Sequence, residues 1–307
     1  MTGEQPLGTL FPPNPEYDYF RAPGFPRATA SYDPVNASWL ADAALLAYGG
    51  EALATARFGA SLHPKSFPGA SALGYVAHGA DFAIVTFRGT EVLSPAANRP
   101  FGDAVLGVAA DLLTDADFKL ERIGDGRHAH RGIVHALDQV WGAVEAHLRT
   151  LRTQGVRTFW FTGHSLGAAM ATLAADRFEH ATALYTFGSP FVGDAAFRDR
   201  FRVPAYRIVH GSDPITRIAP AAPYAELHVP PIERLAHVGT LHQLGEVRSN
   251  AATLGDVAAA IVQGIGASPV DAVREAVRAF LRDTPALALD DHAPIHYATL
   301  LRQAATS

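Results

Sequence analysis

The feature that most constrains the fold of this chain is a turn of sequence G-H-S-L-G at residues 163–167. An apolar run, 157–162, precedes the turn, and a run of small residues typical of a helix, 166–178, follows it. In a G-x-S-x-G turn between a strand and a helix, both glycines permit close packing, and the serine oxygen is held above the edge of a sheet. The motif therefore predicts a nucleophilic serine, Ser165, carried on an α/β sheet.

The rest of the chain alternates strand-like and helix-like runs. The runs that predict strands are 74–78, 81–87, 183–187 and 205–210, and those that predict helices are 37–48, 131–152 and 270–281. This alternation is typical of a mostly parallel sheet flanked by helices. Residues 1–34 are rich in proline and aromatic residues and indicate an extended arm. Because no internal repeat or long linker interrupts them, residues 35–307 are expected to form a single domain.

Composition excludes several classes of function for this 307-residue chain. The formal net charge of −5 disfavours nucleic acid as a partner, because phosphate backbones attract basic surfaces. The chain contains no cysteine, which excludes disulfides, thiolate catalysis and cysteine–zinc sites. No run reaches the ~20 apolar residues of a membrane span, and the first residues lack the pattern of a secretory signal. We expect a soluble protein that contacts lipid at most transiently, and its location stays open.

The carboxylate of a serine hydrolase has a predictable place. A serine hydroxyl needs a histidine to accept its proton and a carboxylate to orient that histidine, and in this type of sheet the order is serine, carboxylate, histidine. Asp213 follows a buried strand in Y-R-I-V-H-G-S-D-P, so it is expected at the same sheet edge as Ser165. Asp194, in S-P-F-V-G-D, is the second candidate. A plain turn aspartate is the alternative interpretation of position 213.

The histidine is less well defined by the residues alone. The candidates near or beyond Asp213 are His210, His228, His237, His242, His292 and His296. We favour His292, which precedes a short helix, over His296, which falls inside that helix behind Pro294. The adjacent His164 is expected to point away from Ser165, as a packing or hydrogen-bonding residue.

No metal or cofactor is expected. Pro294 interrupts the helical face that His292 and His296 would have to share, and no carboxylate lies between them. A loose group of histidines earlier in the chain is more typical of ordinary strand and helix positions: His128, His130 and His135.

Two backbone donors are expected to stabilise the oxyanion of the tetrahedral intermediate. The first is the N–H of Leu166, the residue after the nucleophile. The second comes from T-F-R-G-T-E at residues 86–91, where Gly89 allows a sharp turn and Thr90 offers an N–H and a hydroxyl. In isolation this segment indicates only a turn at a strand end, but its pairing with G-H-S-L-G favours an oxyanion hole.

Together these segments resemble the class 3 lipases, the group named for fungal triacylglycerol lipases. The matching pieces run in the family's order: NASWLADAALLAY at 36–48, VTFRGTE at 85–91, DLLTDADF at 111–118, HRGI at 130–133, FTGHSLGAA at 161–169, YTFGSPFVG at 185–193, HGSDPITRIAP at 210–220 and DHAPIHY at 291–297. The resemblance implies an α/β-hydrolase fold and a reaction without a metal. It also implies the functional residues, with Ser165, Asp213 and His292 as triad and Thr90 and Leu166 as oxyanion donors.

The resemblance carries further expectations and two departures. It suggests that His237 belongs to a strand near the site and is not the base. The secreted fungal members carry signal peptides and disulfides, whereas this chain has no cysteine and we expect no signal peptide in it. The segment between Asp213 and His292 is also unusually long.

A lid is implied at residues 91–110, because in the family a lid follows the oxyanion residue. The side chains expected to rest on the acyl pocket are Phe101, Val105, Leu106 and Val108. A polar stripe of Asp103, Gly107 and Asp111 runs along the same segment at intervals of four. An ordinary buried helix explains the pattern equally well.

The sequence therefore predicts a serine hydrolase of carboxylic esters, a lipase or esterase that acts on acylglycerols through an acyl-enzyme. Its partners would be a lipid or small ester substrate and, transiently, a lipid interface. Phospholipase A1, a feruloyl-type esterase and a membrane-active effector remain alternatives. A non-catalytic binding module on the same fold is less favoured, because the serine, aspartate and histidine are all present.

Overall fold

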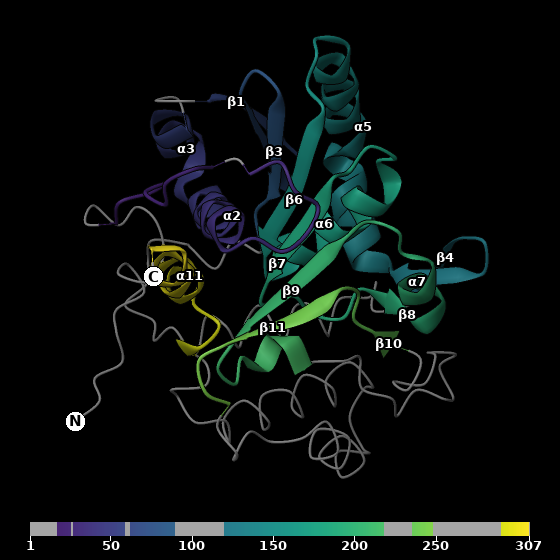
Figure 1. Cartoon of the computed structure of the whole chain (residues 1–307). Helices are drawn as coiled ribbons and strands as arrows, with labels where there is room; N and C mark the ends of the chain where they lie inside the picture. The colour runs from purple at the N-terminus through teal and green to yellow at the C-terminus, as the bar shows by residue number, and fades with distance from the viewer. Residues whose placement is uncertain are drawn as a thin grey trace.

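A seven-stranded sheet forms the centre of the molecule (Figure 1). The computed structural model describes residues 17–25, 27–58, 62–89, 120–217, 235–247 and 290–306. The strands, in spatial order, are β1 (His63–Pro68), β2 (Leu73–His78), β3 (Phe82–Phe87), β6 (Thr158–His164), β7 (Ala183–Phe187), β9 (Ala205–His210) and β11 (Thr240–Leu244). The first three pair antiparallel, and every pairing from β3 to β11 is parallel. The predicted mostly parallel sheet is confirmed.

Helices cover both faces of this sheet (Figure 1). One face carries α2 (Pro34–Leu46), α3 (Gly50–Phe58) and α11 (Pro294–Thr306), and the other carries α5 (Arg131–Thr153) and α6 (Leu166–Arg177). A short 3-10 turn, η1 (Ala47–Gly49), joins α2 to α3. Gly49 and Gly50, which follow the helix predicted at 37–48, therefore mark a corner between two helices. The helix predicted at 270–281 lies outside the described residues.

A second, four-stranded sheet lies beside the first and was not predicted. Its order is β10 (Leu235–Ala236), β8 (Gly193–Asp194), β5 (Arg127–His130) and β4 (Leu120–Gly124), with α7 (Ala195–Arg200) following β8 directly. Two of these strands contain only two residues. Segments so short carry no periodic pattern, so their pairing depends on contacts between distant parts of the chain.

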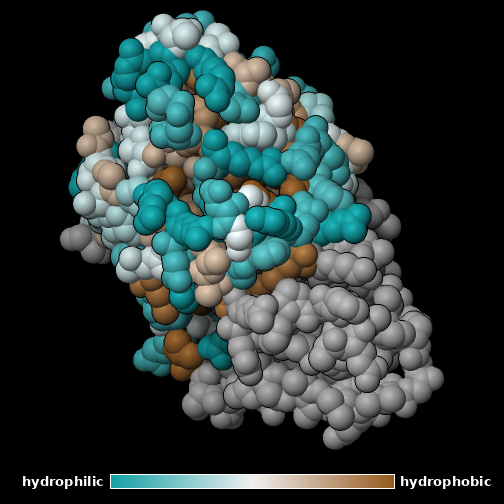
Figure 2. All heavy atoms as spheres, turned by 90° about the vertical axis from the view of Figure 1, so that its right-hand side faces the viewer, coloured by the Kyte–Doolittle hydropathy of each residue, from teal (hydrophilic) through white to brown (hydrophobic). Residues whose placement is uncertain are grey.

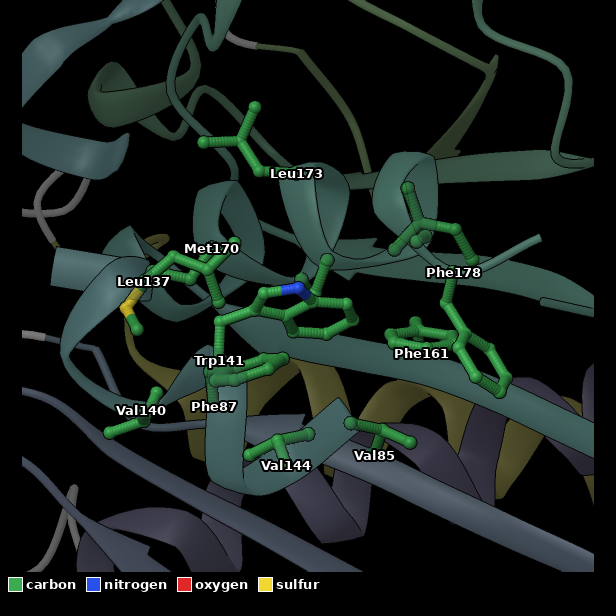
Figure 3. Packing of buried hydrophobic residues seen from close by; sticks show 14 of the residues in the cluster. Val85, Phe87, Leu137, Val140, Trp141, Val144, Phe161, Met170, Leu173 and Phe178 are labelled. Carbon is green, nitrogen blue, oxygen red and sulfur yellow. The ribbon is translucent and has the colours of Figure 1, made fainter. Parts of the chain in front are cut away.

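The core is divided by the sheet into two layers, which explains why β6 is apolar on both sides. Phe159 and Phe161 pack with α5 and α6, whereas Trp160 packs with α2. Figure 3 shows Trp141 of α5 close to residues of the sheet and of α6. The buried face of α5 has the spacing expected of a helix and includes Ile133, Leu137, Val140, Trp141, Val144 and Leu148. A strand covered by helices on both faces has no position left for a solvated side chain.

The described part of the N-terminal arm is anchored to α2. The Tyr17 hydroxyl donates a hydrogen bond to Asp42 Oδ1 (2.5 Å), and the Phe20 N–H donates to Asp42 Oδ2 (2.6 Å). The Trp39 indole N–H donates to the Ala22 carbonyl (2.6 Å). The side chain of Arg302, in α11, lies over the ring of Tyr17. Tyr17 is buried, so this stretch is part of the packed core, and the division at residue 34 stays a prediction.

The face beside α5 is largely hydrophilic, with small hydrophobic patches between polar side chains (Figure 2). Within the described ranges, no helix combines the length and the apolar character that crossing a bilayer requires.

Candidate active site

The turn between β6 and α6 has the strained geometry expected of a nucleophile. Ser165 adopts φ 58° and ψ −129°, a left-handed conformation that non-glycine residues avoid unless the surrounding structure imposes it. A side chain at Gly163 would lie 2.7 Å from the Ala168 nitrogen, and one at Gly167 would lie 2.8 Å from the Phe87 carbonyl carbon. Both glycines are therefore required by the close approach of neighbouring backbone.

Ser165 is buried, with 2% of its surface exposed. Its N–H donates to the Phe187 carbonyl at the end of β7 (3.0 Å), which fixes the turn against the next strand. Its Oγ makes no hydrogen bond to any described residue. Leu166 is the first residue of α6, so its N–H belongs to the helical turn that has no partner within the helix. The start of α6 thus offers a donor and a favourable dipole to negative charge beside Ser165.

Asp213 lies three residues beyond β9 and is fully buried. Its carboxylate accepts from Tyr297 Oη (2.5 Å) and the Ile215 N–H (2.9 Å), and both of its oxygens lie near His292 Nδ1 (3.0 and 2.9 Å). Burial alone would raise the pKa of this carboxyl. The charge of His292 and the hydrogen bonds from His292 and Tyr297 outweigh burial, so that the pKa of Asp213 lies below its usual value. Asp213 is therefore ionised and aimed at one imidazole.

His292 precedes α11, and only 3% of its surface is exposed. Because Nδ1 faces the carboxylate of Asp213, that nitrogen carries the proton, and Nε2 is left as the basic atom. The ring centroid of His292 lies 4.5 Å from that of His164, the residue before Ser165. The structure thus brings the predicted Asp213 and His292 together, next to the turn that carries Ser165.

Ser165 Oγ makes no hydrogen bond to His292 in the described structure. Two sets of contacts place the turn of Ser165 close to His292. The Ser165 N–H bonds to Phe187, and a Cβ atom on the next residue, Gly188, would lie 3.0 Å from His292 Nδ1. The ring of His164 reaches the His292 carbonyl at 2.7 Å. Hydrogen bonds between catalytic groups are often long until substrate binds, so this geometry is compatible with proton transfer.

The competing carboxylate has a structural role elsewhere. Asp194 accepts from the Phe197 N–H at 2.8 Å and so caps α7. Its other oxygen lies 2.9 Å from His128 Nδ1 in the second sheet.

Three of the competing histidines bond to backbone carbonyls. A fourth, His242, lies in β11 and stacks on Tyr32, and its Nε2 makes no hydrogen bond to a described residue. His296 Nδ1 bonds to Asp290 O (2.9 Å) and His210 Nδ1 to Asp291 O (3.0 Å). His237 directly follows β10, and its Nε2 bonds to Thr216 O (2.8 Å). Burial, helped by Arg207, lowers the pKa of His237 to about 4.

Several predicted positions lie outside the described residues. They are Thr90, the lid segment 91–110 with Phe101, Asp103, Val105, Leu106, Gly107 and Val108, then Asp111 and His228. Among the residues that are described, no three side chains come together as metal ligands would. His128 and His130 lie in β5 and His135 lies in α5.

Sequence reasoning did not predict the contacts that support the pair. Tyr297 donates to Asp213, and the Asp291 carboxylate accepts from the Ser212 N–H (2.8 Å), which ties the loop of Asp213 to that of His292. Tyr48 bonds to His164. The tyrosine that follows His292 by five residues was the one local sign of such support in the sequence. The other contacts join segments that are far apart in the chain.

Part of the chain is similar to known proteins. Residues 84–222 match the family model described as Lipase (class 3). A curated relative, the secreted mono- and diacylglycerol lipase 1 of Fusarium solani, is 39% identical over 105 residues. That match spans 31% of this chain and only 31% of the relative. The resemblance to the class 3 lipases is confirmed.

Solved structures establish the fold. The lipase from Rhizopus microsporus var. chinensis aligns with a TM-score of 0.51 and 21% identity, over 74% of this chain and 82% of that one. The Rhizomucor miehei triacylglyceride lipase aligns with a TM-score of 0.50 and 22% identity, over 69% of this chain and 81% of that one. With the mostly parallel sheet flanked by helices, this likeness identifies the α/β-hydrolase fold.

Proposed function

Because residues 84–222 match the class 3 lipases, we propose that this chain is a serine hydrolase of carboxylic esters that acts on acylglycerols. The observation that carries the proposal is the buried pair of Asp213 and His292 beside the strained turn of Ser165. Burial of an ionised carboxylate costs free energy, and this one is held against a single imidazole. Orienting the histidine that accepts the proton of a serine is the role that such a set performs in serine hydrolases. The named relative's acylglycerol specificity supports the substrate class.

The proposed reaction uses the chain's own groups. Ser165 Oγ attacks the ester carbonyl while Nε2 of His292 takes its proton, and Asp213 holds the ring through Nδ1 and stabilises the imidazolium. The Leu166 N–H, with Thr90 as the second donor expected from the sequence, stabilises the oxyanion. His292 then returns the proton to the leaving alcohol. Water attacks the resulting acyl-enzyme by the same route and releases the acid.

A labelling experiment tests the assignment of Ser165. We expect a fluorophosphonate probe to modify the wild-type chain at Ser165, as peptide mapping would detect. We expect Ser165→Ala to lower kcat on a short nitrophenyl ester by about 10⁵-fold or more. Ser38→Ala is the matched control, since Ser38 is also buried and its hydroxyl also makes no hydrogen bond to a described residue. Failure of the wild type to label would favour a non-catalytic binding module.

A substrate panel separates the remaining esterases. The panel contains nitrophenyl esters of increasing acyl length, mono- and diacylglycerols, a phospholipid and a feruloyl ester. We expect the highest kcat/KM on acylglycerols. A preference for the phospholipid would identify a phospholipase A1, and a preference for the feruloyl ester a feruloyl-type esterase.

The proposal extends to contact with a lipid interface through the segment 91–110. If this segment is a lid, activity should rise steeply once a lipid substrate exceeds its solubility. Deletion of residues 101–109 should then raise activity on the dissolved monomeric substrate. Equal rates on both sides of the solubility limit, with no gain from the deletion, would contradict a lid.

A further inference from the structure

His164 connects the turn of the nucleophile to the loop of the base. It is the last residue of β6, it directly precedes Ser165, and only 1% of its surface is exposed. One ring nitrogen, Nε2, lies 2.7 Å from the backbone carbonyl of His292. The other, Nδ1, lies 2.9 Å from the hydroxyl of Tyr48. Both nitrogens of a buried imidazole are therefore engaged, and one of them holds the main chain of the proposed base.

The partners determine where the proton of His164 resides. A carbonyl oxygen only accepts, so Nε2 must carry the proton and donate it to His292. Nδ1 is then a lone pair, and the hydroxyl of Tyr48 must donate to it. Burial, followed by the nearby charge of His292, lowers the pKa of His164 well below its usual value, which agrees with a neutral ring. Tyr48 thus selects the tautomer that can hold His292.

Tyr48 is itself fixed beside the strand that leads to the expected oxyanion residue. It lies in η1 at the corner between α2 and α3, and it is buried. Its hydroxyl packs against Gly89, where any side chain would overlap it. Gly89 also forms a backbone hydrogen bond with this hydroxyl. One phenol therefore contacts the ends of both β3 and β6, and through His164 it acts on His292.

The base has two independent restraints. Asp213 orients the ring of His292, and the Ser212–Asp291 hydrogen bond ties the loop before α11 to the loop of Asp213. The hydrogen bond from His164 fixes the carbonyl of His292 to the strand that carries Ser165. A displacement of about 1 Å between a nucleophile and its base can lower a rate by about 100-fold.

We propose that Tyr48 and His164 are positioning residues that hold the main chain of His292 at the correct distance from Ser165. This inference rests on the proposed hydrolase function and adds two residues to it. Neither residue contacts the reacting atoms in the proposed mechanism. Their effect is transmitted through the backbone of His292, so it should change kcat and leave KM nearly constant.

Two substitutions of His164 separate positioning from packing. In His164→Gln, the side-chain amide nitrogen reaches the place of Nε2 and can still donate to the His292 carbonyl. In His164→Asn, the amide reaches only the place of Nδ1, so the donor to His292 is lost. We expect His164→Asn to lower kcat by about 100-fold with KM within about 3-fold of wild type, and His164→Gln to keep kcat within about 10-fold.

Controls keep the test decisive. His147→Asn is the control variant. It removes a half-buried histidine of α5 whose Nε2 makes no hydrogen bond to a described residue, and it should leave kcat unchanged. Thermal unfolding of each variant measures any structural damage. If His164→Asn does not fold, Tyr48→Phe decides, because it keeps the ring and removes the hydroxyl that donates to Nδ1 and bonds to the Gly89 backbone. We expect it to lower kcat by about 10-fold.

The outcomes distinguish the two proposals. Fluorophosphonate labelling of the wild type at Ser165 is measured first, and its failure would refute the hydrolase function itself. If the wild type is labelled and turns over ester, equal kcat values for His164→Asn, His164→Gln and wild type would overturn the positioning role alone. An unchanged kcat for Tyr48→Phe would overturn the role of Tyr48. A parallel fall of kcat and melting temperature in both His164 variants would mean that the residue serves packing only.

Discussion

Gly188 lies directly against the ring of His292. A Cβ atom added at position 188 would be 3.0 Å from Nδ1 of that ring and 2.7 Å from Oδ2 of Asp213. Gly188 also has a φ of +59°, which L side chains rarely adopt. The glycine that follows β7 therefore leaves room for the hydrogen bond between the carboxylate and the imidazole.

Substitution of this glycine should separate the two groups. We expect Gly188→Ala to lower kcat by about 100-fold or more, because its methyl group occupies the space of the Asp213–His292 hydrogen bond. Esterase kinetics on a soluble nitrophenyl ester measures the loss. The matched control is Gly126→Ala, at a φ of +70° in the turn between β4 and β5, where no atom lies within 4 Å of the added Cβ. That variant should show only the backbone strain, about 1 kcal/mol of stability, with normal kcat.

The two candidate aspartates should behave differently. Asp213→Asn replaces the acceptor of His292 Nδ1 by an amide that stabilises the wrong tautomer, so we expect kcat to fall by about 1,000- to 10,000-fold. Asp194→Asn keeps a good helix cap for α7 and should change kcat by less than about 2-fold. Circular dichroism verifies that both variants are folded. Equal losses in the two variants, or a greater loss in Asp194→Asn, would reverse the assignment.

The hydroxyl of Tyr297 should control the acid stability of the protein. The pKa of Asp213 is depressed in the folded state, so ionised Asp213 stabilises the fold above the pKa of the unfolded chain. That stability is lost as the pH falls through the folded pKa. Tyr297→Phe removes one donor to the carboxylate, which raises the folded pKa, so acid unfolding should begin at a higher pH. At pH 7 the variant should lose about 1.5–3 kcal/mol, because the acceptor is charged.

A second tyrosine provides the control for that variant. Tyr297 Oη accepts from the His210 N–H (3.1 Å), and Tyr185 Oη likewise accepts from the Asp33 N–H (3.1 Å). Tyr185 Oη donates to a neutral carbonyl, that of Ser31 (3.3 Å). Tyr185→Phe should lose about 1 kcal/mol at all pH values, without a shift in the acid transition. Tryptophan fluorescence followed from pH 7 to pH 2 records both transitions. Identical midpoints in the two variants would exclude a special role for Tyr297.

The buried carboxyl of Asp42, which holds the N-terminal arm, should make the fold less stable as the pH rises. Burial raises the pKa of Asp42 to about 7, although the hydrogen bonds from Tyr17 and Phe20 oppose that shift. Because the folded pKa lies above that of the unfolded chain, the stability contributed by the protonated group is complete below about pH 4 and is lost as the pH rises through 7. We expect the free energy of unfolding of the wild type to fall by about 1–3 kcal/mol between pH 4 and pH 8 from this group.

The variant Asp42→Asn should remove this dependence. Its amide oxygen still accepts one hydrogen bond from the arm but never ionises. Urea unfolding at several pH values should therefore give a flatter profile than that of the wild type. The exposed control Glu145→Gln, which breaks a surface pair with Arg149, should retain the wild-type slope. A wild-type slope in Asp42→Asn would show that another group titrates.

Local patterns predicted much of this molecule. The apolar runs of β3, β6, β7 and β9 and the spacing in α5 gave the main sheet and one of its helical layers, because burial imposes a period on each segment. The glycines around Ser165 predicted the turn, since the close backbone approach excludes other residues there. The pairing of Asp213 with His292 followed from chain order and from the resemblance.

Other parts carried no such pattern. β1 (His63–Pro68) has two prolines and an exposed, polar composition, and its strand form depends on pairing with β2. The contacts of Tyr48 with His164 and of Tyr297 with Asp213 join residues 116 and 84 positions apart. Neither contact leaves a periodic trace in the sequence, because each depends on where whole elements pack.

Each of four adjacent parallel strands ends just before one residue of the proposed site. β3 ends before Gly89, β6 before Ser165, β7 before Gly188 and β9 before Asp213. Neighbouring strands of a sheet are spaced by about 4.8 Å whatever their sequence, so the sheet itself fixes the distances between these residues. The turns at the opposite edge of the sheet, such as the one around Gln154 and Gly155, precede the strands and lie far from the ends that carry the site. An affinity tag or a whole reporter domain could be inserted at that edge, and the reaction centre would keep its dimensions.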